Sequence, residues 1–570
     1  MTRPTAAFGL ALFVVLGWSM IRASAPTYDE PVHLASGYAA LLNGSRLING
    51  RDHPPLAEMW AALPLLALRP AAFFHHPDWV MGRVYNYADF FLYKNRVDGE
   101  RMLNAARLWC LLSWGGLLAL GILAWARRLG GDPAMAAAGL LLGLCPPLFT
   151  NAGLVTTDAG SAALFFLMFW ILGSPTLTWP RWLAAGAVMG AAMACKFNMF
   201  ILPFFAAAML LADWRLRRRL APPRQGRPAR GEALPAPARF PARSFAAALL
   251  MAVLVLAAVY RFAHWPAYWQ GLSATLGRLG EGRGSFLLGG HFTTGHPFYF
   301  PLALAVKTPI PLLLAAGVGF WALWRGGDVP RAGSLRDLAW LACPPAAYFC
   351  LALLSKTQIG YRHILPVYPF LVVAGAVGAA WILRQRRGRV LGVLLATWLA
   401  ASVLRAHPHY LAYFNEAAGG PTRGYRCLVD SNLDWGQGLK PLAQWLRRLG
   451  NPPIFLCYFG VADPSYYGIR YMPVGGVTNV ERQEGTALPG ESDAVILAVS
   501  ATNLQTTYYA DHGLFDWLKR RTPVFVAGYS IFVYDLTRDV AGALSLADLM
   551  AASGLAEEAS RLRKRYAHPG

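Results

Sequence analysis

Two adjacent carboxylates, Asp29 and Glu30, lie where the first apolar run of this 570-residue chain ends. Ionisable groups at a membrane boundary are energetically costly, so they indicate a functional site. The same pair could instead favour the start of an amphipathic helix through Val32, Leu34 and Ala35. The two residues alone leave both interpretations open.

Further ionisable side chains follow at the ends of later apolar runs. With a cytoplasmic N-terminus, they all fall on the opposite side of the membrane: the acids Asp52, Glu58 and Asp158, and the bases His53, Lys196, His291, His296, Lys307, Lys356, Arg362 and His363. Carboxylates beside cations suit a hydroxyl nucleophile that loses a proton and an anionic leaving group, for which phosphate is the expected choice at a membrane. Singly, Asp158 could be a helix cap and Lys196 an interface anchor. Their coincidence on one side favours a shared site.

The composition is that of a polytopic membrane protein. Hydrophobic residues make up 56% of the chain and charged residues only 14%, whereas roughly a quarter of a soluble protein is charged. The net charge of +22 would suggest nucleic acid in a soluble chain. Here the positive-inside rule accounts for most of it, so we expect membrane lipids and no nucleic acid as partners. No Cys-x-x-Cys spacing indicates a zinc or redox site.

Eleven apolar runs are candidate spans. They cover residues 6–24, 105–126, 134–149, 159–173, 181–195, 198–212, 244–262, 301–323, 338–354, 366–383 and 390–404. The resulting cytoplasmic loops are 127–133, 174–180, 213–243, 324–337 and 384–389, and all but the second carry arginine. The first extracytoplasmic loop, 25–104, is predicted to hold interfacial helices, and 213–243 is predicted to be a disordered basic linker.

After this transmembrane module, 1–404, the pattern changes and predicts an extracytoplasmic α/β domain over 405–570. Strands are expected at 423–430, 453–459, 494–500 and 524–534, with helices at 439–449 and 545–566. Cys427 and Cys457 could form a disulfide, or they could be two buried thiols.

Several short motifs lie at the ends of the apolar runs and in the C-terminal part of the chain. They are Tyr28-Asp29-Glu30-x-x-His33, His53-Pro54-Pro55-Leu56, Thr156-Thr157-Asp158, Lys196-Phe197-Asn198, the run from Lys356 through Arg362-His363 to Pro366, Gly295-His296-Pro297, Lys307-Thr308-Pro309, and Asp430 to Gln437. Together they resemble the GT-C superfamily, and within it the protein O-mannosyltransferase and aminoarabinose-transferase branch.

The resemblance implies a GT-C fold and inverting transfer of a sugar from a polyprenyl-phosphate donor to an extracytoplasmic acceptor, at a bacterial inner membrane. It places Asp29 and Glu30 at the reaction centre and makes Asp158 a candidate for acceptor or metal binding. The expected donor-phosphate ligands are His53, Lys196, Lys356, Arg362 and His363, and the further loop candidates are His291, His296 and Lys307. Neither the sugar nor the acceptor is implied.

Two alternatives stay open in the sequence. Some relatives use a divalent cation such as Mg²⁺ or Mn²⁺, which Asp29 and Asp158 could hold, so no cofactor is certain. A transporter or lipid flippase is the rival function, but it predicts matching inverted repeats, and the two halves of the chain show no such correspondence.

Overall fold

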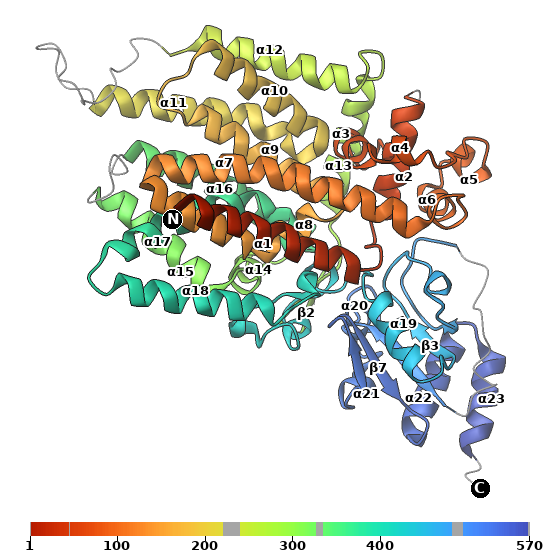
Figure 1. Ribbon diagram of the computed structural model, residues 1–570. Helices are drawn as coiled ribbons and strands as arrows, with labels where there is room; N and C mark the ends of the chain where they lie inside the picture. The colour runs from red at the N-terminus through yellow and green to blue at the C-terminus, as the bar shows by residue number, and fades with distance from the viewer. Residues whose placement is uncertain (1, 45, 221–239, 327–334, 482–493, 568–570) are drawn as a thin grey trace, which may run out of the picture.

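The computed structural model describes residues 2–44, 46–220, 240–326, 335–481 and 494–567. Figure 1 shows a body of stacked helices with a sheet-containing domain, formed by the C-terminal part of the chain, attached at one end. The predicted fold class, a polytopic helical membrane protein with a C-terminal α/β domain, is confirmed.

The helical body contains the apolar runs of the sequence. Its helices are α1 (Thr2–Ala23), α7 (Gly99–Gly143), α8 (Pro146–Ala152), α9 (Thr157–Leu172), α10 (Trp179–Cys195), α11 (Leu202–Leu220), α12 (Ala242–Val259), α14 (Tyr299–Lys307), α15 (Ile310–Arg325), α16 (Leu335–Leu353), α17 (Tyr368–Arg384) and α18 (Gly388–Leu404). Each of the eleven predicted runs lies mainly in one or two of these helices.

The number of straight spans is smaller than the eleven predicted. Among the described residues, five helices are long and apolar enough to cross a membrane, or up to seven if each of two bent pairs is one span. Part of the difference comes from breaks: α7 merges two predicted runs across a kink at Gly131, and α14 bends by 106° into α15 at Thr308 and Pro309. A proline cannot donate the helical hydrogen bond, so it ends or bends a helix. Another part comes from length, because α10 and α18 have only 17 residues each.

The predicted cytoplasmic loops meet at one end of the helical body. Arg336 lies 2.7 Å from Asp213 and donates to the Gly173 carbonyl at 3.1 Å, and Arg128 lies 3.4 Å from Asp337. These contacts join four loops that the topology places on one side. Most of the predicted linker 213–243 lies outside the described residues, because 221–239 are not described. Its first residues, 213–220, belong to α11.

The first long loop folds into short helices, as predicted. They are α2 (Glu30–Leu42), α3 (Leu56–Ala62), α4 (Leu65–Leu68), α5 (Pro77–Met81) and α6 (Val84–Tyr93). Figure 1 shows them at the end of the helical body that carries the C-terminal domain. The loop 263–300 reaches the same end through α13 (Pro266–Glu281) and the hairpin of β1 (Ser285–Leu287) and β2 (Gly290–Phe292).

The C-terminal domain holds a five-stranded sheet in the order β4-β3-β5-β7-β6. Strands β3 (Ile454–Cys457), β4 (Tyr471–Pro473) and β5 (Ile496–Ser500) are parallel, while β7 (Ile531–Asp535) pairs antiparallel with β5 and with β6 (Phe525–Ala527). The predicted helix at 439–449 is α19 (Leu439–Arg448). This mixed sheet supports the predicted α/β class.

Three predictions for this domain are wrong in detail. Residues 423–430 form 3₁₀ turns and no strand, the predicted strand 524–534 is the β6–β7 hairpin, and the predicted helix 545–566 is two helices, α22 (Val540–Ala552) and α23 (Ala556–Ala567). Gly528 and Tyr529 adopt positive φ between the two strands, and Gly554 does so between the two helices. Cys427 and Cys457 are both free, so the possible disulfide does not form.

We predict that Gly139→Ala destabilises the protein, because α1 and α7 pack backbone against backbone there. A Cβ at Gly139 would lie 2.6 Å from the Ala6 Cα, and overpacking of this kind costs about 1–3 kcal/mol. Gly116→Ala in the same helix is the control, since its Cβ would meet nothing within 4 Å. Thermal unfolding in detergent should show a lower Tm for Gly139→Ala alone; equal Tm values would contradict the close packing.

Candidate active site

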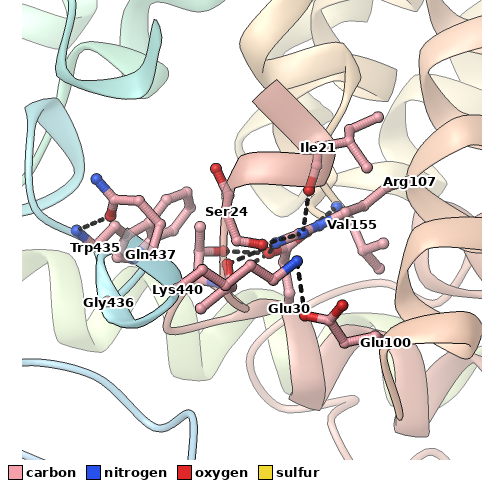
Figure 2. A network of polar contacts seen from close by, with 12 residues as sticks. Ile21, Ser24, Glu30, Glu100, Arg107, Val155, Trp435, Gly436, Gln437 and Lys440 are labelled. Atoms are coloured by element: carbon pink, nitrogen blue, oxygen red, sulfur yellow. Dashed lines mark hydrogen bonds and ion pairs between the residues drawn. The ribbon is translucent and has the colours of Figure 1, made fainter. Parts of the chain in front are cut away.

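A buried ion pair joins the first loop to α7. Glu30 and Arg107 are both fully buried, and the Arg107 guanidinium donates to the two Glu30 oxygens at 2.8 and 2.5 Å. The remaining Arg107 donors reach the carbonyls of Ser24 and Ala25 just after α1, at 3.0 and 2.9 Å. Figure 2 shows these contacts meeting at the Arg107 guanidinium. The pair thus fixes the end of α1 and the start of α2 against α7.

Glu30 also holds the turn that leads to Asp158. Its Oε1 accepts from the Val155 amide at 2.9 Å, and its Oε2 accepts from the Thr27 amide at 2.8 Å. Burial alone would raise the pKa of Glu30, but Arg107 and these amides lower it. With both oxygens occupied, Glu30 is suited to positioning its neighbours, and the geometry does not favour it as a base.

Asp29 and Asp158 meet at one guanidinium. Arg362 Nη1 lies 2.8 Å from Asp29 Oδ2 and 3.6 Å from Asp158 Oδ2, and Lys196 contacts the other Asp158 oxygen. Asp158 is buried, whereas the Asp29 side chain is 22% exposed. Asp29 makes no side-chain cap on α2, so the helix-cap interpretation does not account for it. The structure thus brings four predicted residues together as alternating charges, in the order Asp29, Arg362, Asp158 and Lys196.

A cavity of about 300 Å³ opens beside this cluster. Its polar lining includes His53, Lys196 and His363, and its apolar lining comes mainly from η1 (Phe197–Ile201), α13 and α16. Burial, together with His33 and Lys196, lowers the pKa of His53 well below its usual value, so this ring is neutral at pH 7. Its Nδ1 is buried without a hydrogen-bond partner. The cavity therefore combines apolar walls, one cation and a free imidazole nitrogen.

His33 anchors the loop that carries His53. Its Nδ1 lies 2.8 Å from Glu58 Oε1, which also accepts from Asn49 at 2.6 Å. Burial opposes protonation, but the Glu58 carboxylate outweighs it and raises the pKa of His33. The two imidazole rings lie 4.9 Å apart. His33, the last residue of the first motif, therefore ties α2 to α3 and supports the cavity wall.

Four predicted residues lie elsewhere. Lys356 is exposed and donates to the Gly280 carbonyl at 3.0 Å, and His296 is held through its backbone by Gln358 at 2.7 Å. His291 bonds the Gln505 carbonyl and stacks on His512. Lys307 is buried at the break between α14 and α15. None of these four lines the described cavity.

Two arginines of the site were not among the predicted residues. Arg107 lies inside the predicted span 105–126, where an ionisable side chain is itself a signal of function. Arg283 lies 5.2 Å from the centre of the Tyr508 ring, and the attraction of Tyr508, Asp430 and Asp29 raises its pKa against the effect of desolvation. Only its place between Gly282 and Gly284 marks it in the sequence.

The carboxylates do not form an open metal site. Within the described ranges, no group of three or more His, Cys, Asp or Glu side chains could hold a metal ion. Asp29 and Asp158 share Arg362, and Lys196 occupies the remaining Asp158 oxygen. These residues fit a divalent cation poorly, so we derive no chemical step through one, and metal dependence stays an open prediction.

We predict that Glu30→Gln destabilises the folded protein much more than Asp29→Asn does. Removing the Glu30 charge leaves Arg107 buried and unpaired, which costs about 3–5 kcal/mol. Asp29 is partly exposed, and in Asp29→Asn the Arg362 guanidinium still pairs with Asp158. This variant should therefore change stability much less. Thermal unfolding of both variants measures this, and a Glu30→Gln protein as stable as wild type would contradict the positioning role.

A second prediction concerns pH and Asp434. This side chain is fully buried, accepts from the Thr502 amide at 2.8 Å and has an unpartnered Oδ1, and burial raises its pKa to about 7. The folded protein then holds a proton that the unfolded chain releases near pH 4, so this group's contribution to stability is lost as pH rises from about 4 to 7. In Asp434→Asn that loss should be absent. Unfolding curves at pH 5 and pH 8 test it; the same pH slope in both proteins would contradict it.

The solved structures that match the chain do so at low sequence identity and with TM-scores below 0.5. The Cupriavidus metallidurans ArnT structure bound to undecaprenyl phosphate has a TM-score of 0.48 and 15% identity, covering 93% of this chain and 97% of that one. The Archaeoglobus fulgidus oligosaccharyltransferase AglB, in complex with an inhibitory peptide and a dolichol-phosphate, has a TM-score of 0.42 and 12% identity, covering 77% and 58%. We draw no functional conclusion from likenesses at this level.

The sequence comparison is more specific but shorter. No curated protein matches the chain. A family model described as dolichyl-phosphate-mannose-protein mannosyltransferase matches residues 98–223, which include Arg107, Asp158 and Lys196. Over this segment, the match confirms the resemblance to the protein mannosyltransferases that the motifs predict.

Proposed function

We propose that this chain is a membrane glycosyltransferase that moves a sugar from a polyprenyl-phosphate donor to an acceptor hydroxyl. The observation that carries the proposal is the cavity of about 300 Å³ beside the Asp29–Arg362–Asp158 cluster. Ligand cavities of a few hundred Å³ combine apolar walls with a few polar groups that fix orientation. A lipid phosphate has this same division into an apolar chain and a charged head.

The cavity lining matches such a donor in chemistry. Phe200, Ile201 and Leu276 offer apolar surface for the polyprenyl chain, while Lys196 offers a charge-assisted contact to the phosphate. His53 and His363 line the same cavity and supply further hydrogen-bonding groups. The matched family is named for a lipid-phosphate sugar donor, which supports the same class of substrate.

The cluster suggests how the transfer proceeds. Asp29, the more exposed acid, accepts the proton of the acceptor hydroxyl as its oxygen attacks the anomeric carbon. The bond from that carbon to the phosphate oxygen breaks, and the polyprenyl phosphate leaves with the electron pair, stabilised by Lys196 and its neighbours. A single displacement of this kind inverts the anomeric centre. Asp158 holds Lys196 and Arg362 in place.

The proposal includes a location. The bacterial inner membrane supplies the lipid carrier, and the predicted topology puts Asp29 and the C-terminal domain on the periplasmic side. The grouping of the arginine-rich loops at one end of the body supports this orientation. Nucleotide-linked sugars are cytoplasmic and water-soluble, so they do not fit a site on the other side.

The decisive assay follows sugar transfer by purified protein in liposomes that contain a polyprenyl-phosphate sugar. We expect transfer by wild type and a loss of about 10²–10⁴-fold in Asp29→Asn, the usual contribution of a general base. Transfer from a nucleotide sugar in the absence of a lipid carrier would contradict the proposed lipid-linked donor. Movement of lipid across the bilayer with no transfer would favour a flippase.

In that assay, Lys196→Gln and Lys356→Gln form a matched pair. Both remove one lysine charge, but only Lys196 lines the cavity, whereas Lys356 bonds a backbone carbonyl at the surface. A charge-assisted contact is worth about 1.5–3 kcal/mol, so Lys196→Gln should weaken donor use by roughly one to two orders of magnitude. Lys356→Gln should stay near wild type. Equal losses in both would contradict the placement of the phosphate.

A further inference from the structure

A segment of the C-terminal domain enters the helical body beside the acids. We call residues 430–437, from Asp430 to Gln437, the tail segment. Its backbone pairs with the start of the first loop: the Ala25 amide donates to the Gln437 carbonyl at 3.0 Å and the Tyr28 amide to the Trp435 carbonyl at 2.8 Å. Figure 2 shows Trp435, Gly436 and Gln437 close to Ser24 and Glu30.

The tail segment is internally rigid. The Gln437 side chain accepts from the Trp435 amide at 2.8 Å and donates to the Leu433 carbonyl at 2.7 Å. Gly436 adopts φ of +93°, and a Cβ there would lie 2.9 Å from the Tyr458 hydroxyl, so glycine is required at this turn. These contacts fix the backbone on both sides of Trp435.

The Trp435 ring packs on the guanidinium of Arg362, which pairs with both Asp29 and Asp158. The Arg362 Cζ is 4.1 Å from the centre of the Trp435 ring, and Trp435 is only 2% exposed. A cation over an indole face is attracted by the ring, more strongly where water is excluded. Arg362 Nη1 contacts Asp29 at 2.8 Å. The indole therefore restricts the orientations of the arginine that Asp29 and Asp158 share.

The same segment fixes the backbone next to Arg362. The Tyr361 amide donates to Asn432 Oδ1 at 2.9 Å, and buried Lys307 donates to the carbonyls of Asn432 and Leu411 at 2.5 and 3.0 Å. Lys307 also lies over the Tyr361 and Phe414 rings. This lysine, predicted as a loop candidate for the site, instead locks the tail segment onto the helical body.

We infer that the tail segment is part of the active site, and that Trp435 is a positioning residue that holds Arg362 in contact with Asp29. The inference rests on the proposed function for its catalytic consequence. In this view the C-terminal domain does more than cover the membrane body: it supplies one wall of the reaction centre. Trp435 itself touches neither acid in any described contact and acts through Arg362.

The test compares two tryptophans of the same domain. Trp435→Leu removes the ring from Arg362, Trp435→Phe keeps an aromatic face, and Trp445→Leu is the control because Trp445 stacks on Phe525, 5.2 Å away, within the domain. We expect Trp435→Leu to lower kcat for transfer on the order of tenfold with a smaller change in donor KM. Trp435→Phe should recover most of kcat, and Trp445→Leu should keep the wild-type value.

A double-mutant cycle with Arg362→Gln separates positioning from general loss of structure. If Trp435 acts through Arg362, Trp435→Leu costs little more once Arg362 is gone, in both transfer rate and unfolding temperature. Additive effects in the cycle would overturn the inference. If wild type transfers no sugar, the proposed function fails, and the unfolding cycle still decides whether the two side chains are coupled.

Discussion

The buried pair of Glu30 and Arg107 is the contact on which the rest of the site depends. Removing two charges from water costs several kcal/mol per ion unless the geometry is close and every remaining donor and acceptor is paired. Here the further partners are backbone groups of Thr27, Ser24, Ala25 and Val155. One ion pair thus joins α1, α2, α7 and the turn before α9, and it sets the positions of both Asp29 and Asp158.

This arrangement gives neighbouring acids different roles. Glu30 is closed off inside the protein, Asp158 is buried between Lys196 and Arg362, and Asp29 keeps access to solvent. A general base must reach its substrate, while a charge that organises others is most effective where water is excluded. The C-terminal domain completes the cluster from the other side, because Trp435 packs on Arg362.

The sequence predicted the broad fold and much of the cluster because both follow from local signals. Apolar runs mark the helices, and ionisable residues at their ends share one side of the membrane by topology alone. The position of Lys307 did not follow, since a helix break at Pro309 buries it under the tail segment. Residues 423–430 look like a strand, yet they form turns, and the next residue, Ser431, donates to the Ile359 carbonyl of the helical body. Long-range contacts of this kind leave no local pattern.

A structure of the protein with bound undecaprenyl phosphate tests the central claim most directly, which is that the cavity lined by Lys196 receives the lipid donor. The account predicts the phosphate within about 3 Å of Lys196 Nζ, the distance of a charge-assisted hydrogen bond, and the polyprenyl chain along Phe200, Ile201 and Leu276. A phosphate bound away from Lys196, with this cavity free of lipid, would contradict it.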